Sequence, residues 1–180
     1  MHRTSFGSMA CPIARSLERV GEWWSILILR DAFYGLTRFD QFQKSLGVAP
    51  NILTRRLHAL VDAGLLERRR YQDHPPREEY VLTVRGRDFQ PVLLALLAWG
   101  NRHFAPEGPV VQIVRTDTGA VVEPAVVDPA TGRAIAGAGY ATVPGPGADD
   151  AVRRRLAARG VRPLHPQKQA AAVQPGVTPS

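Results

Sequence analysis

Residues 47–64 read GVAPNILTRRLHALVDAG, and this stretch decides the interpretation of the fold. Its first three residues suit a tight turn, and Pro50 suits the first position of a helix, where its missing N–H costs nothing. Four apolar residues then recur at the spacing of one helix face: Leu53, Leu57, Leu60 and Val61. The stretch therefore predicts a short turn followed by an amphipathic helix from Pro50 to about Ala63.

Three segments before this stretch also have helical character. The first covers about residues 13–20 and ends at Gly21. The second covers about 23–33 and is apolar on nearly every side, which predicts that it is buried in the centre of the domain or in an interface. The third runs from about Arg38 to Ser45. A short helix, a tight turn and a second amphipathic helix together predict a helix-turn-helix unit.

The chain after this unit predicts a hairpin and a final helix. Leu65–Tyr71 and Glu78–Thr83 read as two strands. Pro75-Pro76 marks the tip between them, because proline donates no hydrogen bond to a strand ladder. Thr83 suits the cap of a last helix over about Val84–His103. This order of elements predicts a winged helix-turn-helix domain, with a fold class of α+β that is mainly α.

The composition limits the function classes. The chain has 180 residues and a formal net charge of +7, which suits a polyanionic partner such as nucleic acid. No run reaches the roughly 18 consecutive apolar residues of a spanning helix, and the N-terminus does not resemble a signal peptide, so we expect a cytoplasmic protein. Cys11 is the only cysteine, which excludes an intrachain disulfide and a thiolate zinc cluster. We expect no metal and no cofactor.

The chain divides into four parts by composition. Gly, Pro, Ala and Val dominate beyond the last predicted helix, and Tyr140 is the only aromatic residue there. We therefore expect a flexible arm, a winged helix-turn-helix domain that binds DNA and dimerises, a β-hairpin extension and a tail that is disordered or weakly helical, in the ranges 1–10, 11–104, 105–147 and 148–180.

The outward face of the 50–63 helix carries the predicted base-reading residues. With the apolar face turned to the core, Asn51, Thr54 and Arg55 lie on or beside the opposite face, near the helix start. Asn and Arg can pair with the edges of adenine and guanine in the major groove, and the start of a recognition helix reaches deepest. Arg56 is expected to meet a phosphate. The alternative is that this face is only the solvated side of a surface helix.

The hairpin carries the second predicted DNA contact. Arg68, Arg69 and Arg70 are consecutive, and Arg77 follows the Pro-Pro tip. We predict that Arg68, Arg70 and Arg77 contact the DNA backbone or enter a groove. The alternative is an ion-paired hairpin, because Glu67, Glu78 and Glu79 are close by. Residues 49–87 hold eight arginines and five acidic residues, a modest net charge of +3, so affinity should also depend on dimerisation.

A dimer is expected because one short recognition helix touches few bases. The predicted helices within 13–34 and 84–103 carry more apolar surface than one small winged domain can bury. The candidates for the interface are Trp23, Trp24, Leu97, Trp99 and Phe104. The alternative is that these residues all belong to the core of the monomer.

A longer ordered set of residues points to one family. The set consists of Cys11-Pro12, Arg15, Gly21, Trp24, Ile28-Leu29-Arg30-Asp31, Phe39 to Leu46, Leu53, Arg56-Leu57, Leu60, Gly64-Leu65, Pro75-Pro76-Arg77, Glu79-Tyr80, Leu82-Thr83, Gly86 and Trp99-Gly100. In this combination the chain resembles the HxlR-type winged helix-turn-helix regulators over about residues 11–104. The resemblance implies a homodimeric DNA-binding repressor or activator of MarR-like architecture. The sequence departs from the family at Ala49 and Asn51, where relatives usually have Ser and a basic residue.

The resemblance also bears on the extension and on Cys11. Some family members carry a zinc-ribbon hairpin where this chain has turns at 117–119 and 128–132 without cysteine, so we expect a metal-free knuckle with strands over 110–115 and 120–127. Others sense electrophiles or oxidants through a cysteine at the position of Cys11. The start of a helix and Arg15 would favour its thiolate. The alternative is that Cys11 is a small buried hydrophobic residue at a dimer interface. We slightly favour this alternative, because a reactive thiol must be exposed and the sequence does not show whether Cys11 is. A pocket for a small-molecule effector under the tryptophans stays equally open.

Three other functions compete with a regulator. An enzyme is not expected, because the five histidines are scattered and no Ser elbow, phosphate-binding Gly loop or paired-acid motif is present. A winged helix that binds only proteins would lack salt-dependent affinity for DNA. Membrane binding through Arg153–Arg155 and Arg159 is disfavoured, because Asp149 and Asp150 precede them and no bulky apolar face accompanies them.

Overall fold

The computed structural model describes residues 5–135 and 139–159. The chain forms two compact units, one up to Pro124 and one from Ala125 onward, and each is described by itself. The boundary differs from the predicted breaks near 105 and 148, because the first hairpin of the extension belongs to the first unit. None of the helices described is long and apolar enough to span a membrane.

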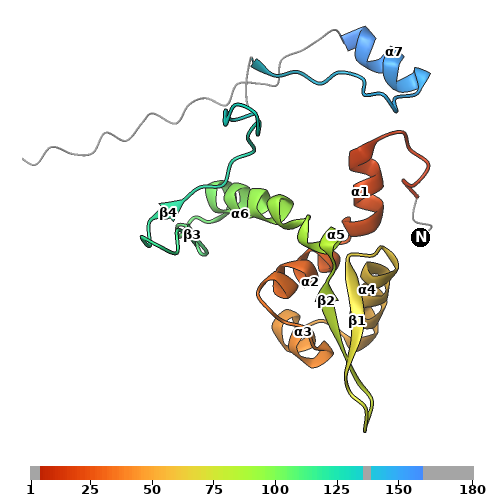
Figure 1. The fold of residues 1–180 in the computed structure, drawn as a ribbon, viewed down its shortest axis with the longest axis vertical. Helices are drawn as coiled ribbons and strands as arrows, with labels where there is room; N and C mark the ends of the chain where they lie inside the picture. The colour runs from red at the N-terminus through yellow and green to blue at the C-terminus, as the bar shows by residue number, and fades with distance from the viewer. Residues whose placement is uncertain (1–4, 136–138, 160–180) are drawn as a thin grey trace, which may run out of the picture. The chain divides into compact units, whose positions relative to one another are not determined.

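Four helices open the first unit in the predicted order (Figure 1). They are α1 (Pro12–Val20), α2 (Trp23–Phe33), α3 (Phe39–Leu46) and α4 (Pro50–Asp62). Proline occupies the start of α1 and of α4, as predicted for the latter. The turn between α3 and α4 depends on Gly47, which has φ 61° and donates its N–H to the carbonyl of Gln43 at 2.9 Å. Glycine adopts this left-handed conformation without strain, which allows the sharp change of direction.

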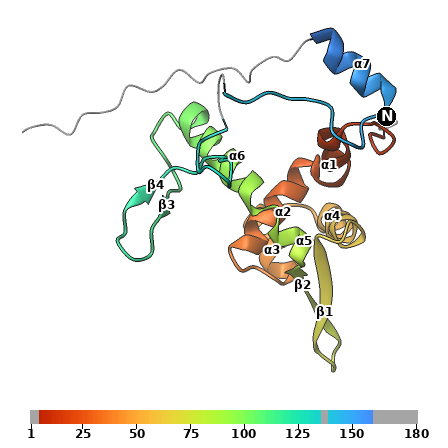
Figure 2. The ribbon, with the colours of Figure 1, turned by 45° about the horizontal axis from the view of Figure 1, so that its top comes forward.

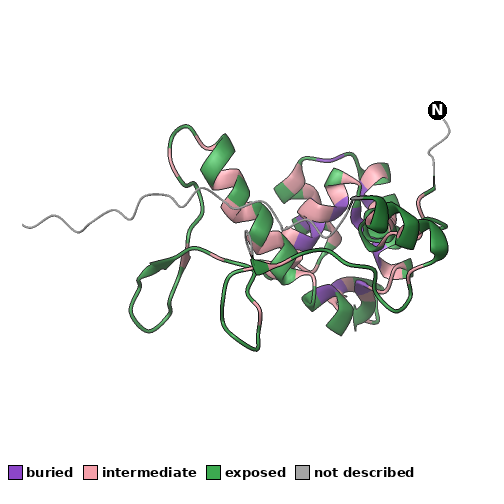
Figure 3. Cartoon of the chain, turned by 90° about the horizontal axis from the view of Figure 1, so that it is seen from above, coloured by how far each residue is buried: buried purple, intermediate pink, exposed green. Residues whose placement is uncertain are grey.

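The core lies where α2, α3 and α4 meet, shown in purple in Figure 3. Leu53, Leu57 and Leu60 of α4 are fully buried, as their spacing predicted. They join a cluster that includes Ile28 and Leu29 of α2. Burying each leucine contributes roughly 1.5–3 kcal/mol, so this stripe fixes α4 on the domain and turns its polar face outward.

The wing is an antiparallel hairpin of β1 (Leu66–Gln72) and β2 (Arg77–Leu82). Leu66 pairs with Leu82 and Arg68 pairs with Tyr80, so one buried residue of each pair faces the core. The segment before α3 adds a short third edge, because Tyr80 donates its N–H to the carbonyl of Thr37 at 2.7 Å. The wing is therefore attached directly to the helix-turn-helix.

The prediction of one last helix over 84–103 is wrong. The structure has α5 (Val84–Arg87) and α6 (Gln90–Phe104), separated at Asp88 and Phe89. Pro91 explains the break, because its ring would clash with the carbonyl of Arg87 and it has no N–H to continue the first helix. The predicted cap is confirmed, since the hydroxyl of Thr83 accepts the N–H of Gly86 at 3.0 Å.

The extension contains two small hairpins rather than one. In the first unit, β3 (Ile113–Val114) pairs with β4 (Val121–Val122), and both strands are shorter than predicted. In the second unit, Val127 and Ala134 form a bridge around the 128–132 turn. The second unit also contains α7 (Asp150–Arg159). Of the two states expected for the tail, disordered or weakly helical, residues 150–159 are helical, as their alanines and arginines favour, and 160–180 lie outside the described residues.

Candidate nucleic-acid interface

The outward face of α4 carries exposed polar side chains at the helix start. Asn51, Thr54 and Arg55 are all exposed, opposite the buried leucine stripe. Arg55 forms no ion pair with any residue that the structure describes. The face therefore offers an amide, a hydroxyl and a free guanidinium, which are groups that can read base edges.

Arg56 does not share this face. Its side chain is only 14% exposed, and its Nη2 lies 3.1 Å from Oε2 of Glu22, directly before α2. The buried Nε of Arg56 has no hydrogen-bond partner. The pairing ties α4 to the start of α2, so the predicted phosphate contact does not fit this geometry. One step along a helix turns a side chain by about 100°, which carries Arg56 toward α2.

The arginines of β1 are ion-paired within the wing, which is the alternative that the sequence left open. Arg68 lies 3.2 Å from Glu78, and Arg70 lies 3.6 Å from Asp73. Arg69 pairs with Glu67. All three pairs are exposed and contribute little to stability, so phosphate could still compete for these arginines.

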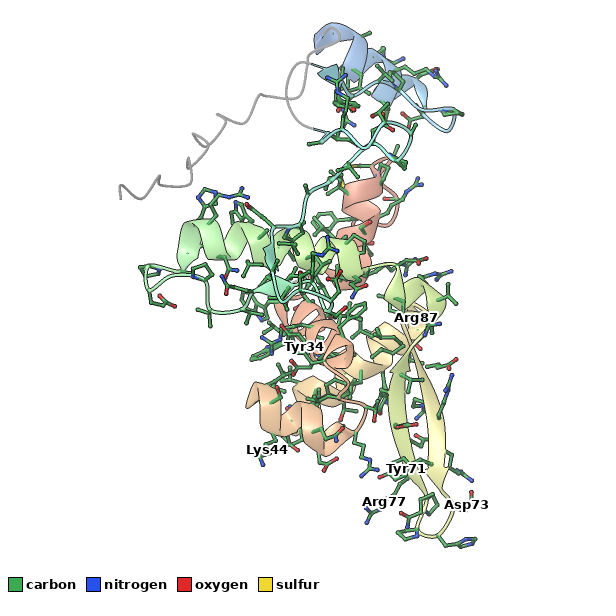
Figure 4. The ribbon with its side chains drawn as sticks, turned by 60° about the vertical axis from the view of Figure 1, so that its left-hand side comes forward. Tyr34, Lys44, Tyr71, Asp73, Arg77 and Arg87 are labelled. Carbon is green, nitrogen blue, oxygen red and sulfur yellow. The ribbon has the colours of Figure 1, made fainter. Side chains whose placement is uncertain are left out.

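Arg77 at the wing tip differs from the arginines of β1. It is exposed and has no acidic partner within the described ranges 5–135 and 139–159. Figure 4 shows Arg77 beside Asp73 and Tyr71 at the end of the hairpin. The tip therefore presents an unneutralised cation in the position predicted for a groove contact.

Two basic residues of this region were not among those predicted from the sequence. Arg38 stacks on the ring of Tyr71, with its Cζ 4.6 Å from the ring centroid. Lys44 is exposed on α3 and lies at the same end of the domain as Arg77 in Figure 4. Nothing local in the sequence marks Arg38, because its contact with β1 spans more than thirty residues of chain. Lys44 could have been found as a polar residue opposite Phe42.

The wing also has one buried titratable residue. Tyr80 of β2 is buried in the core. Burial raises the pKa of its hydroxyl, an effect that the nearby charge of Arg68 opposes and that of Glu78 adds to. Since Tyr80 ordinarily titrates near pH 10, it stays neutral at physiological pH and acts as an anchor for the hairpin.

The predicted interface residues separate into two groups. Trp24 and Leu97 are half-buried, and Trp24 packs against the core. Trp23, Trp99 and Phe104 are 74%, 52% and 67% exposed, so they do not belong to the monomer core. Helix α6 has no buried residue, although it is strongly apolar. Trp99 and Phe104 stack edge to face at its end, with ring centroids 4.8 Å apart.

Cys11 lies at the residue before α1 and is half-buried. Arg15, one turn along, donates its Nε to the carbonyl of Met9 at 2.9 Å and its backbone N–H to the carbonyl of Cys11 at 3.0 Å. The guanidinium is thus engaged with the preceding loop rather than reserved for the thiol.

The turns of the two small hairpins are closed by aspartates. Asp117 accepts both a 3.0 Å and a 2.6 Å hydrogen bond from Arg115, and this interaction lowers the pKa of its carboxyl. Asp128 accepts the N–H of Ala130 at 3.0 Å and the hydroxyl of Thr131 at 2.9 Å, and these bonds also lower its pKa. Within the described residues no three metal-ligating side chains come together. Each turn is therefore closed by hydrogen bonds to its own aspartate.

The HxlR-like helix-turn-helix family model matches residues 19–108 of this chain, half of its length. This chain belongs to the HxlR-like helix-turn-helix family. The matched span contains α2 to α6 and the wing, so the architecture described above is that of the family. The relatives that match this chain are named HTH-type transcriptional regulators, so the chain belongs to a family of transcription regulators.

Relatives support the same assignment and extend it. An uncharacterized HTH-type transcriptional regulator of Mycobacterium tuberculosis H37Rv, Rv3095, is 38% identical over 136 residues, 75% of this chain and 86% of the relative. Another regulator of this type, sll1512 of Synechocystis, is 42% identical over 92 residues, 51% of this chain and 68% of the relative. A 136-residue alignment cannot fit before residue 108, so the likeness to the mycobacterial protein continues into the extension.

Solved structures agree. A candidate transcription factor of Pseudomonas aeruginosa, PA1374, is 55% identical with a TM-score of 0.59, over 81% of this chain and 100% of its own. A second candidate transcription factor, PA1607, is 43% identical with a TM-score of 0.66, over 74% of this chain and 94% of its own. The winged fold predicted from the sequence is thus confirmed.

Proposed function

We propose that this protein regulates transcription as a homodimer that binds a specific double-stranded DNA site. One observation carries the proposal: Asn51, Thr54 and Arg55 are exposed together at the start of α4, on a helix that buried leucines hold rigidly. The unpaired Arg77 at the wing tip supplies a second contact. A recognition helix in the major groove with a wing on the adjacent backbone or groove uses both.

Dimerisation rests on helix α6. Val92, Leu96 and Trp99 are all exposed and recur at i, i+4 and i+7, which places them on one stripe. Leu93 and Leu97 lie on the adjoining face of the helix and are partly buried, Leu93 against the core, and Leu96 lines a hollow together with them. A second copy of the chain is the natural occupant, because a two-fold partner would bring a matching apolar helix and a second recognition helix.

An oxidant is proposed to act as one signal, through Cys11. Two Cys11 thiols of a dimer would lose two electrons and two protons to an oxidant such as diamide, forming an intersubunit disulfide and reduced diamide. A new covalent link at the start of α1 would change the separation of the recognition helices. The Cys11→Ser variant should keep DNA binding and lose any response to diamide. A response that survives in this variant would contradict the proposal.

A protein-interaction module is the second candidate, and the ion-paired wing favours it. Arg68, Arg69 and Arg70 each have an acidic partner, which reduces the charge available for phosphate. Such a module would bind duplex DNA weakly and without sequence preference.

Binding of the purified protein to the intergenic DNA upstream of its own gene separates the two candidates. Fluorescence anisotropy with wild type, Arg55→Ala and Arg133→Ala provides the comparison, because Arg133 is also exposed but lies in the second unit. We expect Arg55→Ala to lower affinity by about 5- to 100-fold, as for the loss of a bidentate base contact, and Arg133→Ala to change it less than twofold. Equal affinities of all three proteins would contradict the regulator.

A further inference from the structure

The space between α6 and the first hairpin of the extension forms a cavity of about 280 Å³ that is open to solvent, since Val111, Val121 and Val122 in its walls are exposed. Figure 2 shows the β3–β4 hairpin beside α6. All of the lining residues belong to the first unit. The apolar walls come from both elements: Leu97, Ala98, Val111, Ile113, Val121 and Val122. The cavity is distinct from the DNA-contacting face of α4.

The hairpin is attached to α6 by polar contacts at the cavity rim. Asn101 donates its Nδ2 to the carbonyl of Val111 at 2.7 Å, directly before β3. Arg102 forms an ion pair with Glu123, directly after β4. Both ends of the hairpin are thereby held to the same helix. An apolar space is left between them, and its walls lack the van der Waals contacts that a filled core would provide.

The size and charge of the cavity indicate the class of ligand. An apolar protein cavity of about 150 Å³ can hold benzene, so 280 Å³ accommodates one or two rings. Arg102 and Glu123 are the only charged residues in the lining, and they neutralise each other. An ionic ligand would have to displace one of them. Asn101 and Gln112 leave hydrogen-bonding groups at the rim for a single polar substituent.

We propose that this cavity binds a neutral, largely apolar small molecule with one or two rings and one hydrogen-bonding group, as the effector site of the regulator. The inference rests on the proposed function for its effect on DNA. The walls from 109 to 124 lie outside the span of the family model, so the site is an addition to the common winged domain. Helix α6 connects the two functions, since its far stripe carries the proposed dimer contacts.

Direct binding tests the site without DNA. The probe is 1-naphthol, a neutral bicyclic molecule with one hydroxyl, and 1-naphthoate is its anionic counterpart. Titration calorimetry with the full chain should show 1-naphthol bound at least tenfold more tightly than 1-naphthoate. Absence of 1-naphthol binding, or equal binding of both probes, would overturn the proposal.

Three variants locate the binding. Ala98→Leu places extra side-chain atoms in the cavity and should weaken 1-naphthol binding at least tenfold. Ala95→Leu makes the same change at an exposed position of α6 that does not line the cavity, and should change it less than threefold. Glu123→Gln leaves Arg102 without its acidic partner, so 1-naphthoate should bind more tightly than to wild type. Equal effects of both leucine variants would place the probe elsewhere and overturn the site.

Operator binding separates failure of this inference from failure of the proposed function. With saturating 1-naphthol, the affinity for the upstream DNA should change at least threefold in wild type and remain constant in Ala98→Leu. Specific DNA binding without any 1-naphthol binding would overturn the effector site and leave the regulator intact. 1-Naphthol bound in the cavity of a protein without DNA specificity would overturn the regulator and, with it, the effector role.

Discussion

Arg38 lies over the ring of Tyr71, with its guanidinium carbon 4.6 Å from the ring centroid, and the contact joins the start of α3 to β1 of the wing. An exposed cation–π pair of this kind contributes about 0.5–1 kcal/mol. The backbone of Arg38 also forms an isolated antiparallel β-bridge with that of Glu79 in β2. The wing is thus oriented by the helix-turn-helix itself.

Loss of this contact should weaken DNA binding by releasing the wing. We expect Tyr71→Ala to lower operator affinity about three- to tenfold while the salt dependence stays unchanged, because no positive charge is lost. The double variant with Arg38→Ala should lose less than the sum of the single effects, as a double-mutant cycle by anisotropy would show. Additive effects would mean that the two side chains act independently.

Arg55 and Arg56 should behave differently although they are neighbours. Arg55→Ala should leave the free energy of unfolding within about 0.5 kcal/mol of wild type and impair DNA preference. Arg56→Ala should destabilise the fold by about 1–3 kcal/mol, because it removes a largely buried partner of Glu22. Urea denaturation measures both variants. A stable Arg56→Ala protein with a reduced salt slope would return Arg56 to the DNA-contacting set.

Gly86 should not tolerate a side chain. A Cβ at this position would lie 2.1 Å from the carbonyl oxygen of Leu65, where α5 passes over the start of the wing. The backbone at Leu65 or Gly86 must move to relieve such a contact. We therefore expect Gly86→Ala to lower the free energy of unfolding by about 1–3 kcal/mol or more. Thermal unfolding provides the measurement, with Gly100→Ala as control because a Cβ there meets no atom within 4 Å. Similar melting temperatures for the two variants would contradict this packing.

Leu96 tests the dimer. Leu96→Asp puts a charge on the exposed stripe of α6 and should convert the dimer to monomer in sedimentation experiments, with at least a tenfold loss of operator affinity. Val143→Asp alters an apolar residue of the second unit that is at least as exposed, and should do neither. A Leu96→Asp protein that remains dimeric would place the interface elsewhere.

The second hairpin should loosen in acid. Its turn depends on the Asp128 carboxylate, whose pKa is lowered by the bonds from Ala130 and Thr131. A lowered folded pKa means that the stabilisation is present above the unfolded value of about 3.9 and is lost as pH falls through the folded value. The amide signal of Ala130 should shift through this transition in NMR spectra, and the Asp128→Asn variant should lose this pH-dependent shift. An Ala130 signal that titrates equally in Asp128→Asn would contradict the assignment.

Periodicity predicted the helices well where one physical cause dominates. The leucine stripe of α4 and the Pro-Pro tip of the wing have local causes, and the structure confirms both. The break before α6 also has a local cause, Pro91, but the apolar pattern on both sides obscured it. The outward positions of Asn51, Thr54 and Arg55 followed from the stripe alone.

Contacts between distant segments of the chain could not be predicted from periodicity. Arg56 turns to Glu22, Arg38 meets Tyr71, and the hairpin at 113–122 packs on α6. Each depends on how two elements are placed in space, which no spacing rule within one element encodes. The arginines of β1 show the same limit, since their partners are set by strand register.

Salt-dependent binding of the upstream intergenic DNA, compared with a scrambled duplex of equal length, tests the central claim most directly. The account predicts that the wild-type protein prefers its own DNA by at least tenfold, and that its affinity falls steeply as salt rises from 50 to about 200 mM. Equal affinity for both duplexes across the salt series would contradict recognition by α4 and the wing.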